Sequence, residues 1–204
     1  MSSVTTPTPR GRPRDPRCDE AIYEAAVTLC AEAGFDGMTL EAVAARAGVS
    51  KPTIYRRCPE GKAQLVAAAI AWRREAKPQS PDTGTLRGDL LATVRDMVAH
   101  MRENAQLAAG LTRQLRASAE LAEIFRVHVI EPERARWIAL VERAESRGEL
   151  VPGAAPSLFP DVAPSLIHTR MTFPSEPLDD AFATELVDRV LLPILNSRDT
   201  EDPS

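Results

Sequence analysis

Six of the eight residues from Ser50 to Arg57 carry polar or charged side chains with hydrogen-bond donors. Hydroxyl, ammonium and guanidinium groups on one short helix suit base edges in the major groove of DNA and the phosphates beside them. Lysine and arginine match guanine edges, and threonine matches a thymine methyl group. The stretch therefore predicts a DNA-contacting helix, in which base reading is expected from Ser50, Lys51, Thr53 and Arg56 or Arg57.

The flanking residues predict that this helix is the second of two short helices joined by a tight turn. Thr39 is a suitable N-cap for the first helix, and Ser50 for the second. Gly48 stands where the corner needs a left-handed backbone, and Pro52 fits the opening turn of the second helix. Ile54 is the one strongly apolar residue left to hold the second helix on the core. This is a helix-turn-helix pattern. The first helix shows apolar residues at helical spacing at Leu40, Val43, Ala44 and Ala47.

Several of these features coincide at fixed spacing, and the segment from about Arg10 to Trp72 closely resembles the DNA-binding domain of the TetR family of bacterial transcription regulators. The resemblance implies that Thr39, Tyr55 and Lys62 bind phosphates, and that two chains related by two-fold symmetry read a palindromic operator in double-stranded DNA. It rests on Gly34-Phe35, Thr39-Leu40, Val43-Ala44, Ala47-Gly48-Val49-Ser50, Thr53-Ile54-Tyr55 and Lys62-x-x-Leu65.

Residues 1–16 are predicted to form a flexible basic arm that resembles the family's N-terminal extension. Arg10, Arg12 and Arg14 are its cations before the first helix. They either enter a minor groove or follow the phosphates. The alternative is a disordered tail that water solvates.

Two departures from the family pattern concern the end of the DNA-contacting helix. Lys62 follows Tyr55 at a spacing of seven positions, where the family usually has six, so one residue is inserted in the loop that ends at Gly61. Cys58 stands where the family commonly has a large aromatic residue. Both features affect the placement of Lys62 against phosphate, whereas neither affects the fold.

Composition and charge favour an all-helical, cytoplasmic, DNA-binding protein. Of the 204 residues, 44% are hydrophobic and only 4% aromatic, so alanine, leucine and valine must build the core, which favours helices. Residues 1–77 carry a net charge of +3 and residues 78–204 a net charge of −7, which places nucleic acid at the N-terminal end. No secretion signal and no apolar run of about 18 residues is present, so no membrane contact is expected.

The three cysteines lack the spacing of a metal site or a disulfide framework, which favours a reducing compartment. Cys30 falls among apolar positions of the first predicted helix. A redox role for Cys58 is an alternative, but no second cysteine lies near it in the sequence.

Proline and glycine positions predict an all-α fold with nine or ten helices, namely an N-terminal helix-turn-helix three-helix domain and a C-terminal helical bundle. The DNA-binding domain is expected at 17–77 and a ligand-binding and dimerisation domain at 78–204. The first helix is expected to end at Gly34, and Pro132 to begin a new helix. Further helices are expected at about 62–76, 86–103, 107–115, 121–128, 132–148, 157–172 and 178–195.

The family resemblance implies that the C-terminal helices bind a small effector and form a homodimer, with helices 157–172 and 178–195 building a four-helix bundle. Flexible methionines and few charges favour a hydrophobic or amphipathic ligand. Ordinary core and surface roles for the same residues are the alternative. The candidate ligand-binding residues are Met97, His100, Met101, Phe125, His128 and Trp137.

Two other functions are alternatives. An all-α enzyme is disfavoured because the three histidines lack metalloprotease spacing, and neither a nucleophile elbow nor a glycine-rich phosphate loop occurs. No catalytic residue, metal or cofactor is therefore expected. A DNA-binding regulator without a small-molecule ligand is the second alternative. Repression is the family's commoner mode, although the position of the operator decides between repressor and activator.

Overall fold

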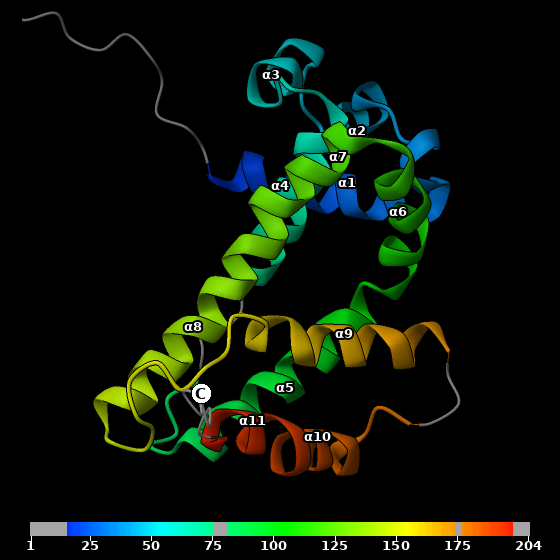
Figure 1. Cartoon of the computed structure of the whole chain (residues 1–204). Helices are drawn as coiled ribbons and strands as arrows, with labels where there is room; N and C mark the ends of the chain where they lie inside the picture. The colour runs from blue at the N-terminus through cyan, green and yellow to red at the C-terminus, as the bar shows by residue number, and fades with distance from the viewer. Residues whose placement is uncertain (1–15, 76–80, 174–176, 198–204) are drawn as a thin grey trace, which may run out of the picture.

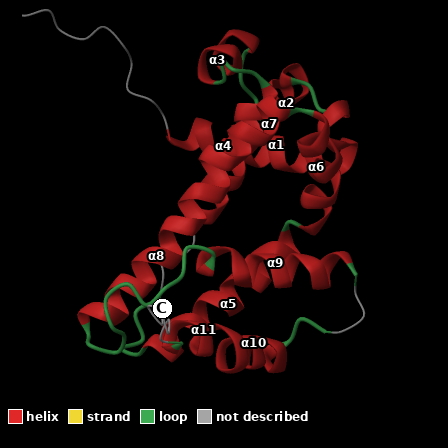
Figure 2. Cartoon of the chain, in the orientation of Figure 1, coloured by secondary structure: helices red, strands yellow, loops and turns green. Residues whose placement is uncertain are grey.

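The structure, a computed structural model, describes residues 16–75, 81–173 and 177–197. Every regular element in these ranges is a helix, and they form nine continuous helical segments (Figure 2). The predicted all-α fold is therefore confirmed. The predicted boundary at residues 77 and 78 lies outside the described residues. None of the described helices combines the length and the apolar character needed to cross a membrane.

The N-terminal body is built on four helices: α1 (Pro16–Gly37), α2 (Leu40–Arg46), α3 (Lys51–Arg57) and α4 (Lys62–Glu75). One face of α1 packs on α4 through small and branched side chains, among which Ile22 and Ala26 are fully buried. Gly34 interrupts α1 with φ +72°, a left-handed conformation that glycine adopts without steric cost. The regular helix therefore ends at Gly34 as expected, and one separate helical turn up to Gly37 follows this kink.

Two helices from the second half of the chain complete this N-terminal core. They are α6 (Ala105–Ala117) and α7 (Ala119–Phe125), which lie beside α1 and α4 in Figure 1. Leu107 and Leu111 of α6 and Leu121 of α7 are each at most 3% exposed and belong to the same apolar cluster as Ile22. The core of the N-terminal body thus contains residues far beyond the first domain that the sequence predicted.

The second body contains α5 (Leu86–Glu103), α8 (Glu131–Ser146), α9 (Phe159–Thr172), α10 (Asp180–Leu186) and α11 (Leu192–Asn196). Its core gathers around Trp137, which is 1% exposed and packs edge-to-face on Phe159 with ring centroids 6.0 Å apart. Such aromatic contacts stabilise the packing beyond the area that they bury. Pro160 lies in the first turn of α9, which accounts for a start later than residue 157.

Two helices widen into π-helical turns, η1 (Arg126–Ile130) and η2 (Val187–Leu191), and each turn ends two residues before a proline. The backbone N–H of Glu131 donates to the carbonyl of Arg126, five residues earlier. A proline ring clashes with the carbonyl four residues before it in an α-helix, and a π-turn relieves that clash. The expectation that Pro132 begins a new helix is wrong, because α7, η1 and α8 form one continuous helix.

Candidate nucleic-acid interface and pocket

The corner between α2 and α3 is held by side-chain and backbone hydrogen bonds. Thr39 caps α2, since its Oγ1 accepts a hydrogen bond from the backbone N–H of Ala42 at 3.1 Å. After α2, Gly48 takes φ +67° and the N–H of Val49 donates to the carbonyl of Ala44 at 2.9 Å. A side chain at Gly48 would strain this turn, because residues with a Cβ rarely adopt such a φ. The corner therefore sets the direction of α3.

Helix α3 is anchored by one side chain and presents polar groups elsewhere. Ile54 is fully buried, whereas Tyr55 is 49% exposed and Lys51 and Arg56 are exposed. The Oγ of Ser50 lies 2.8 Å from the Oγ1 of Thr53 and makes no N-cap hydrogen bond. Figure 1 shows α3 at one extremity of the molecule, far from α9–α11. Its outer face is accessible to a partner as large as a DNA duplex.

Tyr55 is bonded to α2 in the free protein. Its hydroxyl donates to Oε1 of Glu41 at 2.5 Å. This hydrogen bond lowers the pKa of the Glu41 carboxyl and raises the pKa of the Tyr55 hydroxyl. Both groups are solvent-accessible. Because the hydroxyl already donates to Glu41, a phosphate oxygen that approached it would compete with this carboxylate.

Two of the predicted DNA-binding cations have partners inside the N-terminal body. Arg57 is half-buried and forms an ion pair with Asp19 of α1. The ammonium of Lys62 donates to the carbonyl of Phe35 at 2.9 Å and lies 4.6 Å from the centre of its ring. It also reaches the carbonyls of Asp36 and Met38, each at 3.4 Å. Lys62 therefore caps the end of α1, and its contact with phosphate stays a prediction.

Other predictions near this face involve the N-terminal arm and the cysteines. Arg10, Arg12 and Arg14 lie outside the described residues. Cys58 is buried beneath α3, and burial raises the pKa of its thiol. Burial also raises the pKa of the Cys30 thiol to about 11. Because thiolate is the reactive form, burial disfavours the redox role considered for Cys58.

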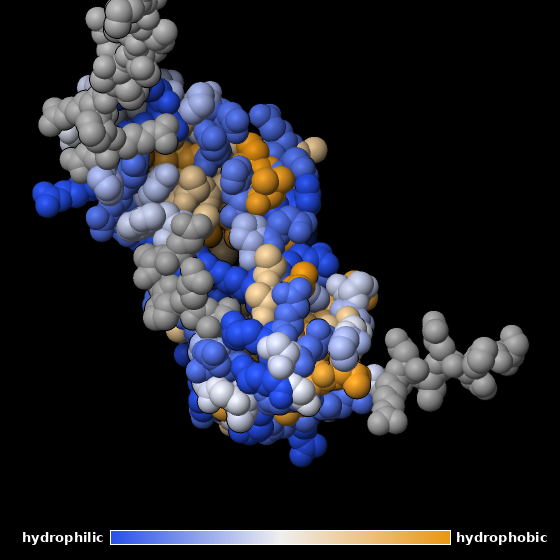
Figure 3. Space-filling model, turned by 90° about the vertical axis from the view of Figure 1, so that its left-hand side faces the viewer, coloured by the Kyte–Doolittle hydropathy of each residue, from blue (hydrophilic) through white to orange (hydrophobic). Residues whose placement is uncertain are grey.

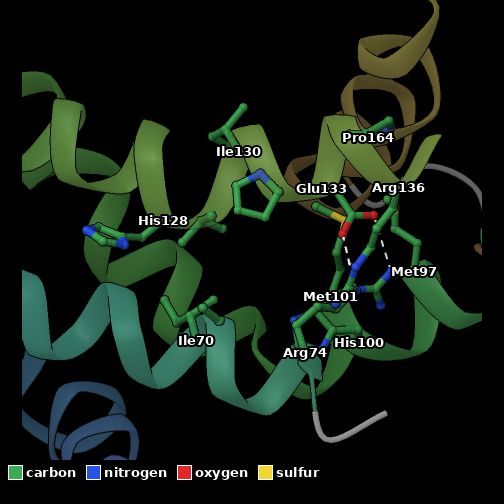
Figure 4. A pocket seen from close by; sticks show the side chains of 13 residues that line it. Ile70, Arg74, Met97, His100, Met101, His128, Ile130, Glu133, Arg136 and Pro164 are labelled. Carbon is green, nitrogen blue, oxygen red and sulfur yellow. Dashed lines mark hydrogen bonds and ion pairs between the residues drawn. The ribbon is translucent and has the colours of Figure 1, made fainter. Parts of the chain in front are cut away.

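A cavity of about 200 Å³ lies where α4 meets α5, η1, α8 and α9 (Figure 4). Figure 3 shows the side of the molecule that carries α4 and α8, where apolar residues line a hollow between two largely hydrophilic ends. Four of the six predicted ligand-binding residues line the cavity, namely Met97, His100, Met101 and His128. The sequence did not predict its other lining residues, which are Ile70, Ala71, Arg74, Val129, Ile130, Pro132, Glu133, Arg136 and Pro164.

The other two predicted ligand-binding residues lie elsewhere. Trp137 is buried in the core of the second body, and Phe125 packs against the core of the N-terminal body. Neither lines this cavity. The helical spacing of Glu133 and Arg136 was a signal that both project from the same face of α8. Nothing in the sequence showed that Arg74 would meet them.

Arg74 connects α4 to the two helices across the cavity. Its Nη1 donates to Oδ2 of Asp96 on α5 at 2.6 Å. Its Nε and Nη2 donate to the two carboxylate oxygens of Glu133 on α8, at 3.1 and 3.2 Å. The side chains of Arg74 and Glu133 are 13% and 21% exposed, so water screens this pair less than a surface pair. Figure 4 shows the pair at one end of the cavity.

The chain is similar to known protein families in both of its bodies. The family model of bacterial regulatory proteins of the tetR family matches residues 22–69. A second model, the tetracyclin repressor-like C-terminal domain, matches residues 80–190. The matches therefore extend well beyond the α2–α3 corner.

Individual relatives agree with these models. The chain is similar to the DNA-binding transcriptional repressor TetR of Mycobacteroides abscessus, with 35% identity over 86% of this chain and 92% of the relative. It is 29% identical to the uncharacterized HTH-type transcriptional regulator YdeS of Bacillus subtilis, over 87% of this chain and 90% of the relative. Among solved structures, the TetR family transcription regulator SCO0332 matches with a TM-score of 0.71 and 29% identity, over 86% of this chain and 97% of that chain.

Proposed function

Because the chain belongs to the tetR family of bacterial regulatory proteins, we propose that it regulates transcription as a homodimer bound to a palindromic operator. The observation that carries this proposal is α3, a short helix that has one buried anchor, an exposed polar face and a fixed corner before it. Such a helix enters the major groove, and a two-fold dimer places two of them about 34–36 Å apart.

The side chains at this face divide into two roles in the proposal. Lys51 and Arg56 are exposed and read bases, together with Ser50 and Thr53. The Tyr55 hydroxyl and the N-terminus of α2 at Thr39 bind phosphates, which sets the register of the protein on the duplex. Arg57 and Lys62 enter this scheme only by leaving their present partners.

The dimer interface is proposed on α9 and on the continuous helix from α10 to α11. Leu166 is 41% exposed, and Met171 and Val190 are half-buried, so each leaves apolar surface that a partner can cover. Ile167 and Leu186, which share the predicted apolar stripes, are buried in this chain's own core. Apolar surface outside the core supports association with a second chain.

We further propose that the protein represses transcription and that a small ligand in the cavity beside Arg74 releases it from DNA. The similar repressor from Mycobacteroides abscessus supports the direction of this effect. The cavity supports the site, because α4, which packs on α1, forms one of its walls. A ligand that prefers an arrangement with misplaced α3 helices shifts the population away from the DNA-binding form.

Selection of binding sites from random DNA, followed by hydroxyl-radical footprinting and sedimentation, tests the proposal. We expect an enriched palindrome with symmetric protection on one face of the duplex and a protein of twice the chain mass. Enrichment of no sequence, or protection of a single half-site by a monomer, would contradict it.

Tyr55→Phe removes only the phenolic hydroxyl group from α3. We expect the affinity for operator and for non-operator DNA to fall by about the same factor, roughly tenfold for two copies, because a phosphate contact carries no sequence information. Titration of both DNAs at one fixed salt concentration measures this. Tyr23→Phe is the matched control, because Tyr23 lies on α1 with its ring in a tilted contact with Trp72 of α4. A loss confined to the operator would assign base reading to Tyr55 instead.

Arg74→Met leaves two carboxylates without the guanidinium that joins them. We expect the free energy of unfolding to fall by about 2 kcal/mol, because breaking a largely buried ion pair strands the remaining charges. The corresponding fall in melting temperature is about 4–8 °C for a chain of this size. Thermal unfolding measures it, with Arg113→Met as the control, because Arg113 is 82% exposed in its pair with Asp36. Equal melting temperatures for the two variants would show that the Arg74 ion pairs contribute nothing.

A further inference from the structure

Arg136 differs from the other arginine of the cavity in its weaker contacts with the residues that the structure describes. It projects from α8 into the cavity wall with a side chain 27% exposed. Its closest ion-pair contact joins Nη1 to Oε2 of Glu133 at 3.7 Å, and it donates no hydrogen bond to any residue that the structure describes. Arg74, in contrast, donates three hydrogen bonds. A half-buried guanidinium with unused donors suits an incoming acceptor.

The rest of the cavity suits a small apolar group. Ile70, Met97 and Met101 line it beside Val129, Ile130 and Pro164. Its volume of about 200 Å³ exceeds the 150 Å³ of an engineered cavity that holds benzene. One ring or one short alkyl chain fits such a space, with room for a polar head at the end that holds Arg74 and Arg136.

The two arginines at that end of the cavity determine which polar head group of a ligand fits there. A carboxylate fits the planar fork of a guanidinium with two parallel hydrogen bonds. An ammonium would meet the like charge of Arg136, while the neighbouring carboxylate of Glu133 already accepts two hydrogen bonds from Arg74. An alcohol would leave most donors of Arg136 unused. We propose that the cavity binds a small amphipathic monocarboxylate, with Arg136 as the residue that grips its carboxylate.

The same geometry gives the ligand a route to the DNA-binding end, and this step rests on the proposed function. Glu133 lies between Arg136 and Arg74. A carboxylate on Arg136 competes with Glu133 for that cation and sets a like charge beside it. The ligand carboxylate also attracts the neighbouring guanidinium of Arg74, so it competes with Glu133 for the cation that links α4 to α8.

Calorimetry on the full chain tests the ligand class with probes that share one apolar body. The panel pairs benzoate, phenylacetate and octanoate with the alcohol and the amine of the same carbon skeleton, and adds phenyl phosphate. We expect at least one carboxylate to bind about tenfold more tightly than its alcohol and its amine. Overturning results are binding of none of the carboxylates, equal binding of an alcohol or amine, or tighter binding of phenyl phosphate than of all three carboxylates.

Three variants test whether Arg136 binds the carboxylate of the ligand. Arg136→Gln is expected to lose about tenfold in affinity for the bound carboxylate, and Arg136→Lys to lose less because it keeps the charge without the fork. Arg134→Gln is the matched control on the same helix, since Arg134 pairs with Asp161 outside the cavity and its loss should leave affinity unchanged. Unchanged affinity in Arg136→Gln, or an equal loss in Arg134→Gln, overturns the assignment.

Operator titration in parallel separates this inference from the proposed function. Carboxylate binding by a protein that shows no sequence preference on DNA would support the ligand site and contradict the operator model. Operator binding by a protein that binds none of the carboxylates would support the operator model and contradict the ligand site.

Discussion

Ile54→Ala is expected to lower the free energy of unfolding by about 3 kcal/mol and to abolish sequence-preferring DNA binding. Ile54 is fully buried and is the only residue of α3 in the buried core, so alanine opens a cavity beneath the helix that presents the polar face. A helix that has lost its anchor no longer holds Lys51 and Arg56, the residues proposed to read bases, in a fixed position.

Urea denaturation followed by circular dichroism, together with operator titration, measures both effects. Ile138→Ala is the matched control, because Ile138 is 49% exposed on α8 and its truncation should cost less than about 0.5 kcal/mol. An Ile54→Ala protein with the urea midpoint and operator affinity of the parent would show that other contacts position α3.

The second large effect is expected from Asp89→Ala, which should lower the free energy of unfolding by about 3–4 kcal/mol. Asp89 is fully buried at the start of α5, where Oδ1 accepts hydrogen bonds from the N–H and Oγ1 of Thr83 at 2.6 and 2.8 Å. Its Oδ2 pairs with Arg147 at 3.0 Å and lies 3.7 Å from Arg143. Removing the carboxylate leaves these partially buried cations without it and frees the loop before α5.

Chemical denaturation at several pH values measures this loss. Burial alone would raise the pKa of Asp89, but the hydrogen bonds from Thr83 and Arg147 outweigh burial and lower it below its ordinary value of 3.8. A lowered folded pKa means that the stabilisation is complete above about pH 5 and is lost as the pH falls through the folded value. The gap between parent and variant should therefore be constant near neutral pH and shrink in acid.

Asp82→Ala is the control for this second prediction, because Asp82 also pairs with Arg147 but is 66% exposed. We expect a change close to zero, as for other exposed pairs. Similar losses in Asp82→Ala and Asp89→Ala would mean that the burial of Asp89 adds nothing.

The sequence predicted the helices and the corner well because local chemistry determines them. Thr39 caps α2 and Gly48 turns the chain, both through interactions within a few residues. The prediction that Pro132 begins a new helix was wrong, because a proline within a helical pattern permits either a break or a π-turn. Packing of α7 on α4 and of α8 on α5 accompanies the continuous helix.

The cavity could be predicted only in part, because its residues come from helices far apart in the chain. Met97 and Met101 were recognisable as one face of a single helix. The meeting of Arg74 with Glu133, 59 residues later, depends on how α4 and α8 cross. Likewise, the partners of Arg57 and Lys62 lie on α1, so periodicity within α3 and α4 gave no sign of them.

The chain builds its two cores alternately: α1–α4 enter the first, α5 the second, α6 and α7 the first again, and α8–α11 the second. Leu107, Leu111 and Leu121 are therefore missing from any fragment cut after α4. A chimera that joins the first 77 residues to the later part of a relative would pack that relative's counterparts of α6 and α7 against Ile22 and its neighbours. Any transfer of DNA specificity between such regulators must therefore include α6 and α7 together with α1–α4.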